Sequence, residues 1–336
     1  MALTFDKQRP IPSPALAPAQ NEFERPTEAE LTIALVNNMP DSALKATERQ
    51  FMRLVQGAAG KRSVRFHYFA LPSVRRSKPA KEHIDKEYTE ITELDRLHID
   101  GLIVTGAEPI APRLQQEQYW REFTGLVDWA RTNTRSTIWS CLAAHAAVLH
   151  LDGVERQRLT QKCSGVYDCA KATSHDWLLD DLPASIKVSH SRLNEVRESE
   201  LIARGYRILT RSTEAGVDIF ARDFDSRFIF FQGHPEYDAL SLQREYMRDI
   251  ARYLGGERET YPAIPASYFD ATTEDILVNF ERRARNERRG ELAAELPGLT
   301  LRPSVPAGGA ATTIFRNWLD YLSVDARAIS SESIRK

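Results

Sequence analysis

The sequence predicts an α/β protein with an open, mostly parallel sheet that has helices on both faces, extended by short antiparallel strands and C-terminal helices. In the first half, almost continuous apolar runs alternate with longer stretches of helical periodicity. Apolar runs of this kind suit parallel strands that are covered on both faces. Beyond residue 152 the apolar runs become shorter and are separated by turn residues, which is typical of antiparallel strands.

Four strands are expected in the first half, and a helical or partly helical stretch follows each of them. The first strand, residues 31–37, is nearly all apolar, and Pro40 and Asp41 mark the start of the helix after it. The charged segment that leads to about residue 97 is expected to be irregular or partly helical. The other strands and helices of this half are expected at residues 63–71, 100–106, 117–131, 136–139 and 142–151.

The second half is expected to contain antiparallel strands, one long helix and a looser C-terminal part. Residues 161–170 are expected to form a turn-containing stretch, and Asp223–Ser226 a hairpin turn. A charged helix is expected at 275–296 and a loop of low order at 297–312. The remaining strands and helices are expected at residues 186–196, 206–212, 216–223, 227–233, 239–254 and 313–322, the last packing on the core through Phe315, Trp318 and Leu322.

We divide the chain into an extended N-terminal arm at residues 1–28, an α/β domain at 29–256 and a C-terminal helical extension at 257–336. The 45 Lys and Arg residues against 47 Asp and Glu residues give no reason to expect a nucleic acid or an anionic membrane as a partner. Three cysteines without zinc spacing predict neither a disulfide framework nor a metal site. The sequence shows no signal or membrane-spanning segment, which predicts a cytoplasmic protein.

Residues 136–151, STIWSCLAAHAAVLHL, place Cys141 where a strand turns directly into an Ala- and Leu-rich helix. A nucleophile at such a junction is lifted clear of the sheet, and the first N–H groups of the helix point at the group that it attacks. The helix dipole also favours the thiolate over the thiol. From this segment alone, a buried cysteine acting as a small apolar side chain is an equally good interpretation. His145 is interpreted as a packed or hydrogen-bonded residue of the helix.

A second strand end delivers His234 and Glu236 to the edge of the sheet where Cys141 is expected. A cysteine and a histidine there are the minimum for a thiolate–imidazolium pair, and a carboxylate two residues later can orient the imidazole. The alternative for His234 alone is a solvated histidine in a turn. An oxyanion hole is expected from the N–H groups of Leu142 and of the backbone near Gly106 and Ala107, where a glycine lets the main chain approach a substrate.

In order along residues 31–322, these segments resemble the homoserine O-acyltransferases of the succinyltransferase family, relatives of the class I glutamine amidotransferases. The resemblance implies a glutamine amidotransferase-like, flavodoxin-like sheet, a homodimer, no bound cofactor, and a ping-pong acyl transfer in the route to methionine. Cys141 would take the acyl group from acyl-CoA as a thioester, His234 would move the proton, Glu236 would orient His234, and homoserine would accept the acyl group. The resemblance is carried by LTIALVNNMP, GLIVTGAEP, YW at 119 and 120, STIWSCLAAHAA, KCSGVYD, SHSR, QGHPEYDA and FRNWLDYL.

The resemblance also implies which residues bind the amino acid. Arg248 matches the arginine that grips the amino acid carboxylate, and a bidentate guanidinium suits that task. Lys162, His190 and Ser191 fall in matching segments and are further candidates for substrate contact, as is Lys45.

The acyl donor is expected to depend on the loop after Gly106. In the family a small residue in this loop leaves room for succinyl, whereas a Glu restricts the site to acetyl. An ungapped match places Ile110 at that position, with Glu108 two residues earlier. Because Ile110 carries no charge that would repel a succinyl carboxylate, we favour succinyl-CoA over acetyl-CoA. Serine remains an alternative acceptor, because one methylene group is weakly discriminated.

Two other functions are consistent with the same fold. A cysteine hydrolase or amidotransferase subunit could use the same three residues, but an amidotransferase is expected to have glycines around the nucleophile, where this chain has Ser140 and Leu142. A silent metabolite-binding module would not need the combination of Cys141, His234 and Glu236. The sequence therefore favours the acyltransferase.

Overall fold

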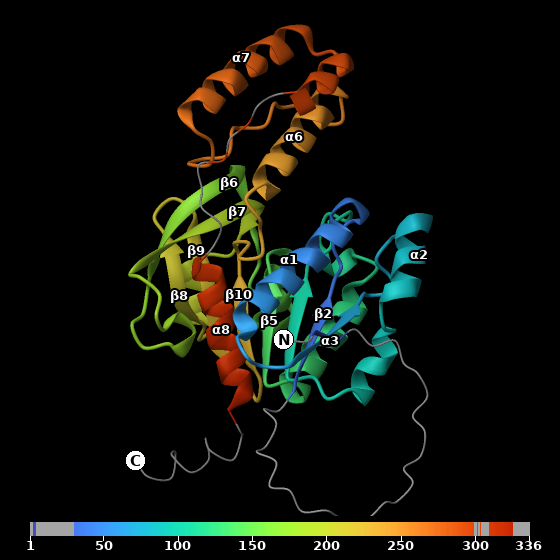
Figure 1. Cartoon of the computed structure of the whole chain (residues 1–336), viewed down its shortest axis with the longest axis vertical. Coiled ribbons are helices and arrows are strands. Elements are labelled where there is room, and N and C mark those ends of the chain that lie inside the picture. The colour runs from blue at the N-terminus through green and yellow to red at the C-terminus, as the bar shows by residue number, and fades with distance from the viewer. Residues whose placement is uncertain (1–2, 5–29, 299–300, 302, 304–308, 325–336) are drawn as a thin grey trace, which may run out of the picture. The chain divides into compact units, whose positions relative to one another are not determined.

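The structure, a computed structural model, describes residues 3–4, 30–298, 301, 303 and 309–324. Apart from residues 3–4, the predicted arm lies outside the described residues, and so does most of the predicted loop after residue 297. The chain forms two compact units, whose elements are labelled in Figure 1. The domain boundaries at residues 28 and 256 remain predictions. The first unit contains residues 1–139, 223–228 and 315–336, and the second contains residues 140–222 and 229–314.

The first unit holds the parallel strands. Strand β2 (Leu31–Val36) lies between β3 (Val64–Phe69) and β4 (Gly101–Thr105), and both pairs are parallel. The short strand β1 (Leu3–Thr4) pairs in parallel with β3, and β5 (Ser136–Ser140) is the neighbour of β4. Every residue of β4 and β5 is buried, as the apolar runs predicted for strands covered on both faces. The predicted α/β class is therefore confirmed.

The helices of the first unit follow the predicted pattern with small shifts at their ends. The first begins at Asp41, buries Leu44 and Phe51, and carries Lys45 on its exposed side. The segment expected to be irregular or partly helical contains α2 (Lys78–Glu87), which Ser77 caps by accepting a hydrogen bond from the N–H of Ala80. The other helices are α1 (Asp41–Ala59), η1 (Ile91–Arg96), η2 (Leu114–Gln116) and α3 (Trp120–Asn133).

The second unit holds the antiparallel strands. Strand β6 (Gln157–Lys171) pairs with β7 (Ser185–Glu195) and β8 (Arg207–Ser212), and β8 pairs with β9 (Gly216–Asp223), all antiparallel. The chain turns after β9, as predicted, and β10 (Arg227–Phe231) lies beside it. The helices of this unit are α4 (Leu142–Asp152), η3 (Trp177–Leu179), α5 (Glu198–Ala203), α6 (Ser241–Leu254), α7 (Ala271–Glu287) and η4 (Gly290–Gly298).

Two predictions for the second half are wrong. Residues 161–170, expected to contain a turn, lie within β6. Gly165 lies inside this strand, where its missing side chain makes room for the backbone of Ala266, because a Cβ there would lie 2.4 Å from the Ala266 oxygen. The charged helix expected at 275–296 ends at Glu287, because Arg288 adopts a left-handed conformation with φ of 40° and caps the helix.

Helices α6, α7 and η4 share an apolar core, to which Val166 of β6 also belongs. Its aromatic side chains include Tyr253 and Tyr261, which pack edge to face with ring centroids 5.2 Å apart. This core fixes α6 so that polar residues of the helix face β6 and β7. Neither these helices nor any other helix in the described part of the chain is long and apolar enough to cross a membrane.

The last helix, α8 (Gly309–Ser323), completes the core of the first unit. Phe315, Trp318 and Leu322 are fully buried, as predicted. The indole N–H of Trp318 donates to the Ser136 hydroxyl at 3.0 Å. The rings and methyl groups of Trp318 and Leu322 close over Gly101 at the start of β4, where an added Cβ would lie 2.6 Å from both side chains. The space left by the missing side chain of Gly101 therefore forms a socket that Trp318 and Leu322 of α8 fill.

Gly101→Ala should lower the free energy of unfolding, because a methyl group at this position overlaps Trp318 and Leu322, and overpacking costs about 1–3 kcal/mol. The matched control is Gly125→Ala in α3, where an added Cβ meets no atom within 4 Å. There alanine should stabilise the protein by up to about 1 kcal/mol through its helix propensity. Urea unfolding followed by tryptophan fluorescence measures both changes. A Gly101→Ala protein as stable as the parent would contradict the close packing of α8 on β4.

Candidate active site

Cys141 occupies the junction between β5 and α4 in a backbone conformation that residues with a side chain rarely adopt. Its φ and ψ angles are 52° and −110°, and no loop residue separates the strand from the helix. A conformation of this kind costs about 1–3 kcal/mol, so neighbouring contacts must hold it. The N–H of Cys141 donates to the carbonyl oxygen of Phe231 at 2.7 Å, which ties the junction to the end of β10. The N–H of Leu142 lies in the first turn of α4 and has no acceptor within the helix.

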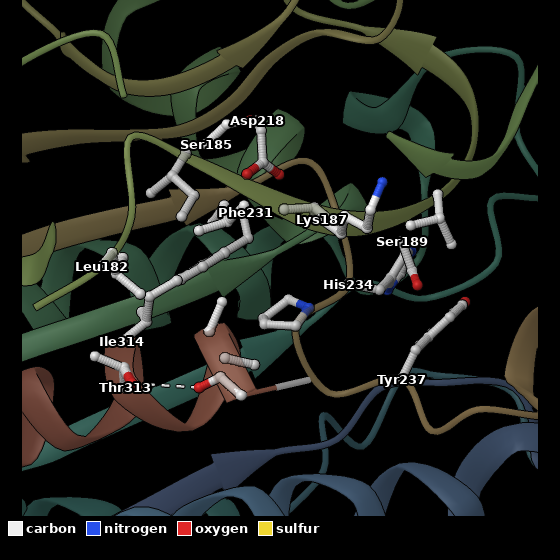
Figure 2. Close-up of a pocket in the computed structure, with 18 of the residues that line it drawn as sticks. Leu182, Ser185, Lys187, Ser189, Asp218, Phe231, His234, Tyr237, Thr313 and Ile314 are labelled. Carbon is white, nitrogen blue, oxygen red and sulfur yellow. Dashed lines mark hydrogen bonds between the residues drawn. The ribbon is translucent and has the colours of Figure 1, made fainter. Parts of the chain in front are cut away.

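His234 and Glu236 form a buried pair just beyond β10. Nδ1 of His234 lies 2.9 Å from Oε1 of Glu236, and each side chain is only 6% exposed. The backbone N–H of His234 donates to the carbonyl of Ser189 at 2.8 Å, and the ring of Tyr237 stacks on the imidazole at a centroid distance of 4.2 Å. His234 and Tyr237 line a cavity of about 350 Å³ in the second unit (Figure 2). With Nδ1 engaged by Glu236, Nε2 is the nitrogen that remains for proton transfer.

The surroundings of His234 favour its cation. Burial alone would lower the pKa of this histidine, but the charges of Glu236 and Cys141, with the hydrogen bonds of both groups, raise the pKa well above its ordinary value. The second unit therefore brings Cys141, His234 and Glu236 together. A thiolate beside an imidazolium is a competent nucleophile at neutral pH, and the carboxylate fixes the ring that protonates or deprotonates its reaction partner.

Three of the predicted substrate-binding residues gather around two carboxylates of α6, the partly buried Glu245 and the buried Asp249. Nζ of Lys162 lies 3.0 Å from Asp249 and 3.5 Å from Glu245. The hydroxyl of Ser191 donates to Glu245, and Arg248 donates to Oδ1 of Asp249 through Nε at 3.1 Å and Nη2 at 2.9 Å. Burial raises the pKa of both carboxyl groups, but Lys162 and the hydrogen bonds that they accept bring both pKa values below the ordinary range. Both groups are therefore anions.

Sequence reasoning missed Glu245, Asp249 and Tyr237. The hydroxyl of Tyr237 donates to Oε1 of Glu245 at 2.5 Å while its ring stacks on His234, so Tyr237 joins the carboxylate group to the catalytic pair. A signal for the two carboxylates was available in the sequence. They stand four residues apart around the candidate Arg248, and residues with this spacing share one face of a helix.

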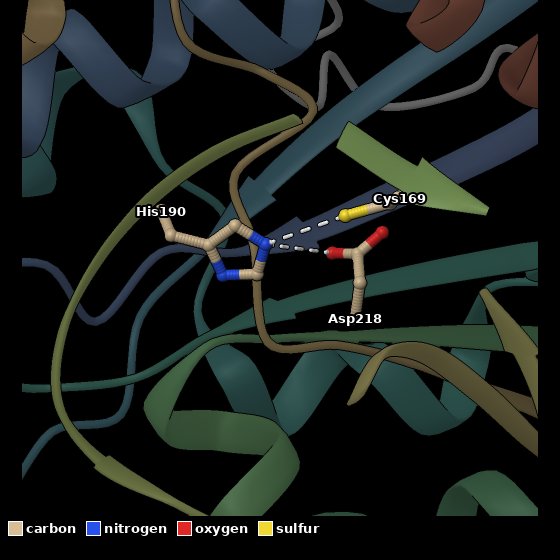
Figure 3. Close-up of side chains that lie close together, drawn as sticks. All are labelled: Cys169, His190 and Asp218. Atoms are coloured by element: carbon tan, nitrogen blue, oxygen red, sulfur yellow. Dashed lines mark hydrogen bonds and ion pairs between the residues drawn. The ribbon is translucent and has the colours of Figure 1, made fainter. Parts of the chain in front are cut away.

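His190 does not join the group around α6. It stands between Ser189 and Ser191 on β7, and successive residues of a strand face opposite sides of the sheet. Its Nε2 lies 3.4 Å from Oδ1 of Asp218 and 4.0 Å from Sγ of Cys169 (Figure 3). All three side chains are fully buried. A contact between His190 and the substrate therefore stays a prediction that the direction of its side chain does not support.

Cys169, His190 and Asp218 are residue types that bind zinc, and their ligand atoms lie within 4.8 Å of one another. The charges around them oppose a metal dication, because Arg192 and the cationic His234 both act on this cluster. Nε of Arg192 also donates to Nδ1 of His190 at 3.4 Å. Burial raises the pKa of the Cys169 thiol, whereas a metal ligand must be a thiolate. We therefore interpret the cluster as a hydrogen-bonded support behind His234.

The predicted oxyanion and acyl-selecting residues after β4 belong to the first unit. Gly106 is half-buried and Ala107 is buried, whereas Glu108 and Ile110 are exposed. Glu117 shapes this loop, because its Oε1 accepts hydrogen bonds from the N–H groups of Ile110 and of the next residue, each at 2.7 Å. The loop lines a cavity of about 740 Å³ within the first unit. The roles of these residues remain predictions.

Comparisons with known proteins agree with one another along almost the whole chain. Residues 19–328 match a family model described as homoserine O-succinyltransferase. The chain is 63% identical to the homoserine O-succinyltransferase of Bradyrhizobium japonicum, over 96% of this chain and 99% of the relative. It is 56% identical to that of Rhodopseudomonas palustris, over 96% and 99% of the two chains. Among solved structures, a glutamine amidotransferase of Thermotoga maritima is 13% identical with a TM-score of 0.48, covering 88% of this chain and 99% of that one.

Asp218→Asn should change how stability depends on pH. Burial raises the pKa of Asp218 to about 6, so the folded state holds this proton more tightly than the unfolded state, whose pKa is about 3.9. Stability from this group is therefore present below pH 4 and is lost as the pH rises through 6, by about 3 kcal/mol in all. Relative to the parent, the variant should gain stability by that order between pH 4.5 and pH 7.5.

Urea unfolding at the two pH values measures this difference. Asp168→Asn is the matched control, because the Asp168 side chain on β6 is 69% exposed and forms an ion pair with the exposed Lys187. Its effect on stability should be small, because an exposed ion pair contributes only about 0–1 kcal/mol. A difference between Asp218→Asn and the parent that does not vary with pH would show that Asp218 titrates as an ordinary carboxyl group.

Proposed function

Because the chain belongs to the homoserine O-succinyltransferase family, we propose that it transfers a succinyl group from succinyl-CoA to the hydroxyl of homoserine. The observation that supports this most directly is the half-buried Cys141 beside the buried pair of His234 and Glu236, in which the pKa of the imidazole is raised by both neighbours. This reaction is an acyl transfer in the route to methionine. It needs a nucleophile that can hold the acyl group between two substrates, and a thiolate meets that need.

In the first half-reaction, the Cys141 thiolate attacks the thioester carbonyl of succinyl-CoA. The tetrahedral intermediate collapses and expels the CoA thiolate, which takes the proton of His234. The products are a succinyl-cysteine thioester, free CoA and a neutral imidazole. The developing oxyanion would be stabilised by the N–H of Leu142 at the start of α4.

In the second half-reaction, neutral His234 accepts the proton of the homoserine hydroxyl as its oxygen attacks the thioester. Collapse of this intermediate releases O-succinylhomoserine and restores the thiolate beside the imidazolium. Glu236 holds Nδ1 at 2.9 Å throughout, which keeps Nε2 directed at the reacting atoms and stabilises the cation. One histidine thus serves as acid in the first step and as base in the second.

Homoserine itself would bind among the charged side chains around α6, replacing some of the contacts that they make with one another. Arg248 uses two of its donors on Asp249 and its side chain is 40% exposed, so donors remain for the carboxylate of the amino acid. Lys162 would assist from the other side. Glu245, an anion that already accepts from Ser191 and Tyr237, suits the ammonium group. Serine as acceptor is the second candidate substrate, since it lacks only one methylene group.

A cysteine hydrolase or amidotransferase remains the second candidate activity, because a thioester enzyme that admits water in place of homoserine hydrolyses its donor. The charged group of Lys162, Arg248 and Glu245 argues for an amino acid acceptor instead. The family resemblance also supports a cytoplasmic homodimer, which sedimentation velocity would test.

Cys141→Ser should abolish nearly all transfer, because a serine hydroxyl is scarcely ionised at neutral pH. Cys163→Ser and Cys169→Ser are the matched controls and should keep most of the activity. Incubation of each protein with succinyl-CoA alone, followed by intact mass spectrometry, should show a succinyl adduct in the parent and in both controls but no thioester in Cys141→Ser. Equal losses of activity in all three variants would refute Cys141 as the nucleophile.

Glu245→Gln should raise the Michaelis constant for homoserine by about tenfold or more, because a charge-assisted hydrogen bond is worth about 1.5–3 kcal/mol. The Michaelis constant for succinyl-CoA should change little. Arg248→Lys should act in the same way, since an ammonium group cannot reproduce the guanidinium fork. Initial rates with each substrate varied in turn give these constants. An unchanged constant for homoserine in both variants would move the amino acid site elsewhere.

Ile110→Glu should reduce kcat/KM for succinyl-CoA more than for acetyl-CoA. Two carboxylates 4 Å apart repel by about 1 kcal/mol in water and about 4 kcal/mol at an effective dielectric of 20, or roughly 5- to 1,000-fold. Ile110→Gln is the uncharged control and should leave the ratio of the two donors nearly unchanged. Rates are measured with homoserine saturating. A parent protein that prefers acetyl-CoA tenfold would overturn succinyl-CoA as donor, and reversal by Glu108→Gly would make Glu108 the selector.

A further inference from the structure

The residue two before His234 is a fully buried glutamine that connects three elements. Oε1 of Gln232 accepts the N–H of Val196 at 3.0 Å and lies 2.9 Å from Nε2 of His145. Its Nε2 donates to the carbonyl of Val217 at 2.8 Å. Gln232 therefore joins β9 and the segment after β7 to His145, which lies on α4 one turn beyond Cys141.

The donor and acceptor roles in this contact follow from the surrounding groups. Because the Gln232 amide nitrogen donates to a carbonyl, Oε1 must be the atom that faces His145. Burial lowers the pKa of His145 to about 3, so its ring is neutral and carries a single proton. That proton must be on Nε2 to meet an oxygen. Nδ1 is then an unprotonated nitrogen, and it has no hydrogen-bond partner in the described part of the chain. His145 thus acts only as a donor.

Two links connect the nucleophile to the segment that carries the base. The first is the main-chain bond from Cys141 to the carbonyl of Phe231 at 2.7 Å. The second is the side-chain bond from His145 to Gln232, the next residue along the chain. On the nucleophile side, the N–H of His145 donates to the Cys141 carbonyl at 3.3 Å, which closes the first turn of α4. One main-chain hydrogen bond and one side-chain hydrogen bond therefore join the same two segments, the start of α4 and the end of β10.

We propose that His145 and Gln232 are positioning residues that set the spacing between the sulfur of Cys141 and the imidazole of His234. This inference rests on the proposed thioester function. The main-chain bond fixes the start of α4 at Cys141, and the second link fixes the helix again one turn later. The requirement is strict, because a misplacement of about 1 Å can cost about 100-fold in rate. Neither side chain touches substrate.

His145→Leu removes the donor while keeping an apolar side chain of similar bulk, and His145→Gln restores a donor through its amide. We expect His145→Leu to lower kcat by about 10- to 100-fold, with the Michaelis constant for homoserine within about twofold of the parent. His145→Gln should recover most of that loss. In His145→Leu/Gln232→Leu the loss should be no greater than that of the more severe single variant, because both substitutions break one link.

The readout that separates positioning from mere stability is the pH dependence of Cys141 alkylation by iodoacetamide. The midpoint of this profile should lie at higher pH in His145→Leu than in the parent, because the imidazolium of His234 stabilises the thiolate only at its native distance. Gly101→Ala controls for general destabilisation and should leave the midpoint unchanged. The other titratable groups around the pair are not altered by these variants: Glu236, Tyr237, His190, Asp218 and Glu245.

A folded His145→Leu protein with the parental midpoint and kcat would overturn the proposal and leave the pair a structural contact. If His145→Leu does not fold, His145→Gln must keep the parental midpoint and Gln232→Asn, whose shorter side chain cannot reach His145, must shift it. Failure of either result also overturns the proposal. The alkylation profile needs no acyl-CoA, so it tests the spacing even if the parent protein transfers no succinyl group, which would refute the proposed function instead.

Discussion

The left-handed backbone of Cys141 persists because the end of β10 holds it in place. The carbonyl of Phe231 accepts the Cys141 N–H, and three residues later the same stretch of chain presents His234. One short segment therefore carries both the anchor of Cys141, the proposed nucleophile, and His234, the proposed base. The strain at Cys141 and the buried charge of His234 are both unfavourable alone, and each is stabilised by contacts that this segment makes.

In the second unit, positive and negative side chains lie next to one another in two groups. Cys141 and Glu236 flank the His234 cation, and Glu245 and Asp249 lie among the cations Lys162 and Arg248. Each buried charge has a partner of opposite sign, which is the condition under which ions persist away from water. Tyr237 lies where the two groups meet, with its ring on the imidazole and its hydroxyl on Glu245.

The parallel strands and the two strand ends with Cys141 and His234 were predictable, because continuous apolar runs and an abrupt change to helical sequence are local signals. Strand β6 was not predictable, because its residues alternate irregularly between buried and exposed. In addition, the glycine at position 165 is required by the close approach of Ala266, which is remote in sequence. The face of the sheet on which the His190 side chain lies depends on the register of β7, because a shift of one residue moves every side chain of a strand to the opposite face. Glu245 and Asp249 have helical spacing in the sequence, but their partners Lys162 and Ser191 are remote along the chain and are seen only in the structure.

The socket at Gly101 has a consequence for the order in which the chain can fold during synthesis. The start of β4 is made first, and Trp318 and Leu322, which close over it, are made about 220 residues later. At about 5–20 residues per second, the socket stays uncovered for roughly 10–40 s. During that time the apolar surface that α8 later covers is accessible to chaperones and to other nascent chains. The core of the first unit can close only after the second unit has been made.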